Sequence, residues 1–134
     1  MSSKEQRVSS AITKARRLFV KRAHDQALTV CDRALKADPG SCKAYDLRWM
    51  ILGDKLSPDQ MQRTINPEVK TFLNSREETS EVLFTAYWGY MRHPSRTQNV
   101  PDSLFERMQK YPGTDTLLTA LLGLAERSQD PLQQ

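Results

Sequence analysis

The chain has 134 residues and a net charge of +4, with 38% hydrophobic and 27% charged residues, which suits one globular domain with a single core. No apolar run approaches the roughly 18 residues that span a bilayer, and the start, MSSKEQRVSS, lacks the apolar core of a secretory signal. We therefore expect no membrane association and a cytoplasmic or nuclear location. A single domain over 1–134 is predicted, with flexible ends at 1–4 and 129–134.

The charge is unevenly distributed. Residues 1–48 contain eleven Lys or Arg against five Asp or Glu, whereas the remaining residues contain nine against eleven. A basic N-terminal third can attract an acidic peptide or a nucleic acid, or it can be a solvated helix surface. The composition leaves these alternatives open.

Apolar residues at spacings of three and four predict a first helix over 5–22 and a second over 25–37. Asp38-Pro39-Gly40 should end the second helix, because Pro cannot continue the hydrogen-bond ladder. A third helix over 41–52 is apolar around most of its circumference, so we expect it at the centre of the domain.

The second half of the chain contains several helix-start motifs. Ser57 with Pro58 and Asn66 with Pro67 predict two short helices, over 57–66 and 67–73. Ser75-Arg76-Glu77-Glu78 has the pattern of a capping box and predicts a helix over 75–92, whose apolar stripe is widened by Phe84 and Trp88. A polar loop over 93–100 and helices over 101–110 and 114–127 complete an all-α chain of about seven helical segments.

Small and large residues alternate along the stretch from Ala15 to Pro39 in a characteristic order, through Leu18, Ala27, Cys31 and Ala34. This order resembles a tetratricopeptide repeat (TPR), in which small residues let two helices approach and a Pro closes the unit. The resemblance covers this repeat and the next helix through Leu52, after which the period decays. It implies antiparallel hairpins stacked as a short TPR-like right-handed solenoid. The segment 104–112 resembles the half-a-TPR repeat of RNA-processing scaffolds.

Tetratricopeptide repeats bind peptides in a concave groove lined by the first helix of each repeat. On this chain the resemblance places six residues in that groove: Ser9, Ile12, Arg16, Lys43, Asp46 and Met50. Arg16 and Lys43 would make the groove positive and suited to an acidic ligand. Leu47 stands where the chaperone-binding subclass has an Asn, so we expect no capture of a chaperone's C-terminal carboxylate.

Motifs for catalysis, metal binding or cofactor binding are not apparent. Cys31 and Cys42 are eleven residues apart, and His24 and His93 are scattered, so neither a zinc site nor a nucleophile with an adjacent base is expected. There is no phosphate-binding glycine loop and no HExxH motif. The sequence predicts a protein that is not an enzyme and needs no cofactor or metal.

The function that remains is a protein–protein interaction module, a scaffold or adaptor that binds a peptide motif or partner helix of a larger complex. The alternative is an RNA-processing-associated adaptor that contacts nucleic acid through its basic N-terminal helix, with Lys14, Arg17, Lys21 and Arg22 as the contacts. A homo-oligomer formed through an apolar end face is a further alternative. Its candidate residues are Phe105, Leu118 and Leu122.

Overall fold

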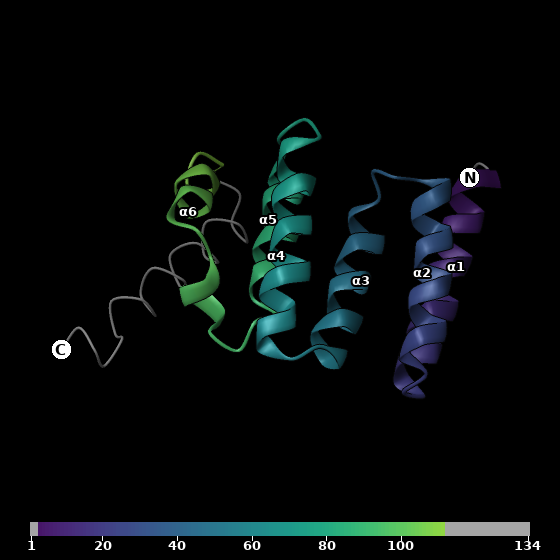
Figure 1. Cartoon of the computed structure of the whole chain (residues 1–134). Coiled ribbons are helices and arrows are strands. Elements are labelled where there is room, and N and C mark those ends of the chain that lie inside the picture. Colours follow the sequence, from purple (N-terminus) through teal and green to yellow (C-terminus); the bar gives the residue numbers. More distant parts are fainter. Residues whose placement is uncertain (1–2, 112–134) are drawn as a thin grey trace.

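The computed structural model describes residues 3–111, which contain six α-helices, one 3₁₀-helix and no strand (Figure 1). The described part of the chain is thus all-α, as predicted. The predicted helix over 114–127, with Leu118 and Leu122, lies outside the described residues, as does the end at 129–134. The elements are α1 (Ser3–Val20), α2 (His24–Ala37), α3 (Cys42–Lys55), α4 (Pro58–Asn74), α5 (Ser80–Tyr90), η1 (Arg96–Asn99) and α6 (Asp102–Met108).

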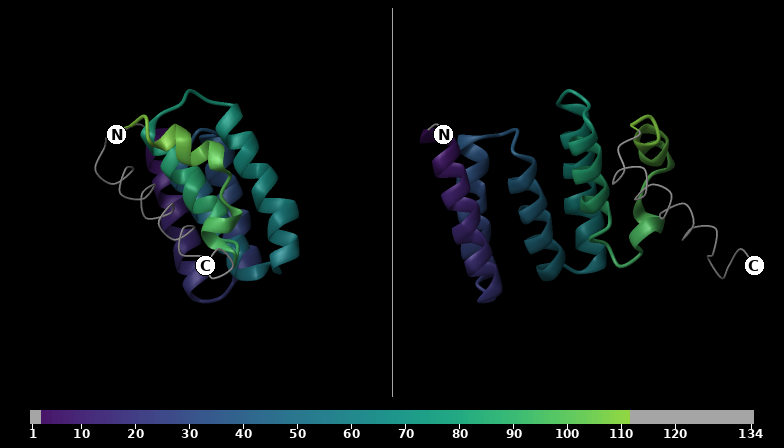
Figure 2. Two further views of the ribbon diagram at one scale, coloured as in Figure 1. Left: turned by 90° about the vertical axis from the view of Figure 1, so that its left-hand side faces the viewer. Right: turned by 180° about the vertical axis from the view of Figure 1, so that it is seen from behind.

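The helices follow one another in chain order from one end of the molecule to the other (Figures 1 and 2). α1 packs on α2, α2 on α3, and α4 on α5. In addition α1 contacts α3, and α3 contacts α5, so these alternate helices are neighbours in space. α1 begins at Ser3, so Ser3 and Lys4 belong to the helix rather than to a flexible end.

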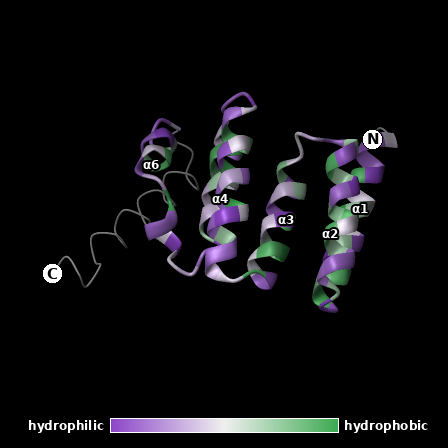
Figure 3. Ribbon diagram, viewed as in Figure 1, coloured by the Kyte–Doolittle hydropathy of each residue, from purple (hydrophilic) through white to green (hydrophobic). Residues whose placement is uncertain are grey.

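The core consists of two hydrophobic clusters that share α3. The N-terminal cluster joins α1, α2 and α3 and contains Leu47 and Ile51 of α3, whereas the C-terminal cluster joins α3 to α4, α5 and α6 and contains Trp49 and Leu52. The prediction that this helix lies at the centre of the domain is therefore confirmed. Green hydrophobic and purple hydrophilic segments alternate along the helices in Figure 3, as expected for amphipathic packing.

Small residues allow the close packing of α1 on α2. Ala15 of α1 and Ala27, Cys31 and Ala34 of α2 are all at most 1% exposed. The Cys31 thiol donates a hydrogen bond of 3.1 Å to the Ala44 carbonyl oxygen of α3. These residues carried the repeat resemblance, and their burial explains why larger side chains are absent there.

The prediction of two short helices at 57–66 and 67–73 is wrong, because α4 is one helix with Pro67 inside it. Asn66 does not cap a new helix: its side-chain amide exchanges hydrogen bonds of 2.8 and 3.0 Å with Asn99. Buried Ile65 and Val69 on either side of the proline hold the helix against the core. Pro67 itself is exposed, where the hydrogen bond it cannot donate costs least.

The predicted helix start at Ser75 is also wrong. Ser75 ends α4, and α5 begins at Ser80 with Thr79 as its N-cap, whose hydroxyl accepts a 3.1 Å hydrogen bond from the Val82 N–H. Two of the charged residues of the apparent capping box make tertiary contacts. The Arg76 guanidinium lies 5.3 Å from the centre of the Tyr45 ring of α3 and 3.9 Å from that of the nearby Phe72.

Glu78, the last residue of that motif, connects to the C-terminal end of the described chain. Its carboxylate accepts hydrogen bonds from the Tyr111 hydroxyl at 2.8 Å and from Arg107 Nε at 2.6 Å. Both hydrogen bonds lower the pKa of Glu78, and the bond from Tyr111 has the larger effect.

The C-terminal elements differ from the expectation in two further respects. The predicted loop over 93–100 contains the 3₁₀-helix η1. Phe105, a candidate for an exposed end face, is 1% exposed and lies with its ring centre 6.0 Å from that of Tyr87. α6 has only seven residues and buries the Phe105 ring in the core. Phe105 is therefore not available to pair with another chain.

α5 packs tightly against α3 and α4 at Gly89. A Cβ atom at this position would lie 2.7 Å from Trp49 Cε3 of α3 and 2.7 Å from Val69 Cγ2 of α4. Both neighbours are fully buried and cannot move aside freely. Only a residue without a side chain lets α5 pack at this distance from both helices.

We expect Gly89→Ala to destabilise the protein. The overpacking should cost about 1–3 kcal/mol, more than the helix propensity that Ala gains over Gly. Urea unfolding followed by circular dichroism measures this. Gly40→Ala is the matched control, because its nearest contact would be at 3.7 Å, an ordinary van der Waals distance. Equal stability of the two variants would contradict the assigned role of Gly89.

Candidate functional site

Two hollows lie on the side of the molecule formed by α1, α3 and α5. The first, of about 470 Å³, is lined by Lys4, Glu5, Val8, Ser9, Ile12, Thr13, Arg16, Asp38, Ser41 and Lys43. The second, of about 500 Å³, is lined by Arg16, Cys42, Lys43, Asp46, Glu81, Phe84, Thr85, Trp88 and Arg92. Because Arg16 and Lys43 line both, the hollows form one continuous surface, which we call the groove.

The structure brings most of the predicted partner-binding residues together. Of the six, Met50 alone lines neither hollow, and it packs partly buried against the N-terminal cluster. Ile12 is 8% exposed and forms part of the floor. The others line the groove: Ser9, Arg16, Lys43 and Asp46.

The groove is positive at its centre only. Four acidic and four basic side chains line it, and two of the acids pair with the two cations at its ends, whereas Glu81 forms no ion pair within residues 3–111. Asp38 lies 3.9 Å from Lys4, and Asp46 lies 3.8 Å from Arg92. Arg16 and Lys43 are exposed, and within residues 3–111 neither forms an ion pair.

Aromatic side chains of α5 form the far end of the groove. Phe84 and Trp88 are half-buried, four residues apart, with ring centres separated by 6.1 Å. Sequence reasoning placed both in an apolar stripe and missed them as groove residues. One signal in the sequence could have identified them: Phe84 and Trp88 are four residues apart on α5, which is the third helix that lines the groove, after α1 and α3.

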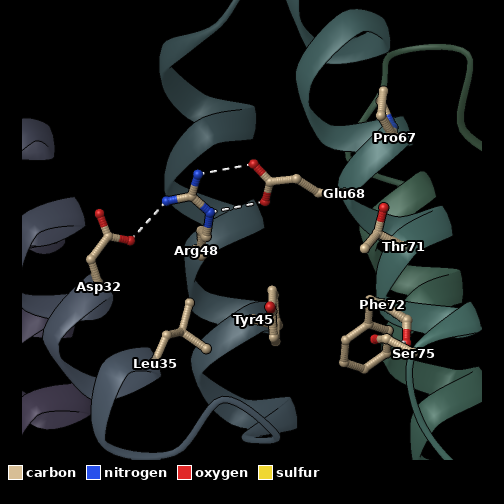
Figure 4. Close-up of a pocket in the computed structure, with 9 residues that line it drawn as sticks. All are labelled: Asp32, Leu35, Tyr45, Arg48, Pro67, Glu68, Thr71, Phe72 and Ser75. Carbon is tan, nitrogen blue, oxygen red and sulfur yellow. Dashed lines mark hydrogen bonds and ion pairs between the residues drawn. The ribbon is translucent and has the colours of Figure 1, made fainter.

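The opposite side of α3 carries a charged cluster that joins three helices (Figure 4). Arg48 donates hydrogen bonds of 2.9 Å to Asp32 of α2 and to both carboxylate oxygens of Glu68 of α4. The Trp49 indole N–H also donates to Glu68, at 3.2 Å. The hydrogen bond to Glu68 raises the pKa of Arg48, so its charge is permanent. This cluster borders a hollow of about 460 Å³.

The predicted nucleic-acid contacts lie outside the groove. Lys14, Arg17, Lys21 and Arg22 are exposed and line neither of its hollows. Lys21 and Arg22 follow the end of α1, and Arg22 has a positive φ of 64° in the turn. Lys14 instead borders a separate hollow of about 250 Å³ between α1 and α2, together with Arg33.

In residues 3–111 no group of three or more His, Cys, Asp or Glu side chains is arranged to hold a metal ion. None of the described helices combines the length and the apolar character that crossing a membrane requires. Comparisons of the chain with protein-family models, with curated proteins and with solved structures return no match.

The two cysteines should differ in reactivity. Cys31 is fully buried, and burial raises its pKa to about 11, so at pH 8 about one molecule in a thousand carries the reactive thiolate. Cys42 is half-buried in the groove, and burial raises its pKa less strongly. We expect Ellman's reagent to modify Cys42 slowly in the folded protein and Cys31 only in urea. Cys42→Ser should abolish the native reaction, and simultaneous modification of both thiols would contradict the assignment.

We expect Arg48→Met to destabilise the protein by about 1–3 kcal/mol, because it leaves two carboxylates without their partner. The control is Arg63→Met, which removes an ion pair with Asp59 whose two side chains are 72% and 74% exposed. That change should cost less than about 0.5 kcal/mol. Urea unfolding distinguishes the two, and an effect of Arg48→Met as small as that of Arg63→Met would contradict a clamping role.

Proposed function

We propose that the chain is a short TPR-like right-handed solenoid that acts as a non-enzymatic protein–protein interaction module in the cytoplasm or nucleus. Two observations support the repeat architecture. Small residues are buried between α1 and α2 at the positions of the repeat resemblance. The alternate helices α1, α3 and α5 contact one another in succession, the arrangement that a groove lined by first helices requires.

The groove takes an extended segment of a partner protein that combines a carboxylate with a nearby apolar side chain. The observation that carries this proposal is the junction of the two hollows, where Arg16 and Lys43 stand unpaired. A carboxylate placed between them gains charge-assisted hydrogen bonds. Phe84 and Trp88, along the same groove, offer an apolar surface to the neighbouring side chain.

Capture of a chaperone's C-terminal carboxylate does not fit this groove. Leu47 is 1% exposed and belongs to the N-terminal cluster, so the position where that subclass has an Asn faces the core. The ligand is therefore an internal acidic segment of a scaffolded complex, and the protein acts as an adaptor.

Selection from a random 12-residue peptide library tests the groove. We expect the selected peptides to contain Asp or Glu close to an aromatic or aliphatic residue. Their affinity should fall about tenfold or more in Arg16→Glu/Lys43→Glu, since about 1.4 kcal/mol corresponds to a factor of ten. Isothermal titration calorimetry measures the change.

The control for this experiment is Lys70→Glu/Lys110→Glu, which alters the net charge equally at two exposed positions outside the groove. It should bind the peptides as the unaltered protein does. Trp88 fluorescence provides a second readout, because the other tryptophan, Trp49, is fully buried. Peptides without acidic residues, or an affinity that the groove variant leaves unchanged, would remove the proposal.

A further inference from the structure

The α1–α2 pair forms the N-terminal end of the helix stack (Figure 1), and its sequence carries a row of exposed basic side chains. Arg7, Lys14 and Lys21 are seven residues apart, two helical turns, so they share one side of the helix. Lys21 follows the last residue of α1, but its N–H still donates to the Arg17 carbonyl at 3.1 Å and continues the row. The six exposed members, which we call the basic end face, are Arg7, Lys14, Arg17, Lys21, Arg33 and Lys36.

No acidic residue of α1 or α2 neutralises the basic end face. Glu5, the acid of α1, lines the groove. Of the two acids of α2, Asp25 pairs with Lys55 of α3, and Asp32 with Arg48 of α3 at 2.9 Å. Both acids therefore have their ion-pair partner on α3, although Asp32 precedes Lys36 by four residues and lies on the same side of α2. Within residues 3–111 none of the six cations forms an ion pair.

The apolar side chains of this face are recessed between its helices. Leu18, which is half-buried, and Val30, which is 6% exposed, line the hollow between α1 and α2. The exposed Val20 follows Arg16 by four residues and Arg17 by three, so it stands between the groove side and the basic end face. A peripheral membrane site combines cations with several protruding apolar side chains that insert among the lipids, and a base-reading site presents aromatic rings for stacking. The basic end face has neither a protruding apolar cluster nor an aromatic ring among its members.

We propose that the basic end face binds the phosphate backbone of a nucleic-acid strand without reading its sequence. Lys14 and Arg33 stand on either side of the hollow between α1 and α2, whose lining also includes Gln26 and Thr29 as hydrogen-bonding groups. A phosphate there meets a cation from each helix. The row from Arg7 to Lys21 extends about 21 Å. Together with Arg17, Arg33 and Lys36 beside it, the row offers six cations, one for each of about six phosphates.

The binding should depend steeply on salt. Each phosphate contact releases a condensed counterion, so about six contacts to a single strand give a slope of log K against log salt of about −4. Fluorescence anisotropy with a labelled 15-residue oligouridylate, titrated from 50 to 200 mM NaCl with the full chain, measures this slope. The affinity should be the same, within a few-fold, for an oligoadenylate of equal length, because phosphate contacts carry no sequence information.

Four double variants with the same change in net charge locate the site. Lys14→Glu/Lys21→Glu should weaken binding about tenfold or more and make the slope shallower by about 1.4. Arg16→Glu/Lys43→Glu in the groove and Lys70→Glu/Lys110→Glu on the far helices should each change it less than about threefold. Arg33→Glu/Lys36→Glu changes the α2 side of the basic end face and should weaken binding to the same extent as Lys14→Glu/Lys21→Glu. Circular dichroism verifies that every variant is folded.

The groove and the basic end face are tested separately by this set. Loss of peptide binding with retained oligonucleotide binding in Arg16→Glu/Lys43→Glu supports both sites. An equal loss of oligonucleotide binding in all variants would show attraction by net charge alone and overturn the proposal. So would no binding at 50 mM NaCl, or binding only to vesicles containing 30% phosphatidylserine and not to the oligonucleotide.

Discussion

The close approach of α5 to α3 at Gly89 is the constraint on which the rest of the structure depends. Trp49 and Val69 occupy the space that a side chain at this position would need. Because α5 packs this closely, its exposed edge brings Phe84 and Trp88 into the same groove as Arg16 and Lys43. A wider separation would divide the α1, α3 and α5 surface into two unrelated patches.

Helix α3 contributes to both hydrophobic clusters, to the charged cluster and to the groove. It joins both hydrophobic clusters, and its Arg48 ties α2 and α4 together on the side away from the groove. On the groove side the same helix presents Lys43 and Asp46. A helix so thoroughly fixed by packing and ion pairs is a rigid base for a binding surface, which reduces the entropy that a ligand must overcome on binding.

The allocation of charge links the two proposed sites. Carboxylates of the N-terminal third are paired internally or near the groove, whereas cations of α1 remain unpaired on two of its sides. The groove side has Arg16 beside an apolar floor and suits a peptide. The outer side has cations without ion pairs and, under the second proposal, suits phosphates. Under the two proposals, α1 contributes to both sites.

The errors in the predicted fold share one physical cause. Asn66-Pro67 and Ser75 with its acidic followers have the local chemistry of helix starts, and in isolation each would favour one. In the folded chain Asn66 bonds to Asn99, and Glu78 to Tyr111 and Arg107, partners more than 25 residues away in sequence. A local motif shows which hydrogen bonds a side chain can form, and tertiary contacts determine which of them it forms in the folded chain.

The sequence by itself determined the all-α class, the small residues between the first two helices and the central position of α3, because helical periodicity and side-chain size are local properties. The repeat resemblance also placed Arg16 and Lys43 side by side, and both line the two hollows. Only the tertiary structure decided that Phe84 and Trp88 complete that groove and that Met50 does not. It alone decided which cations remain unpaired, because Asp25 and Asp32 find their partners on another helix.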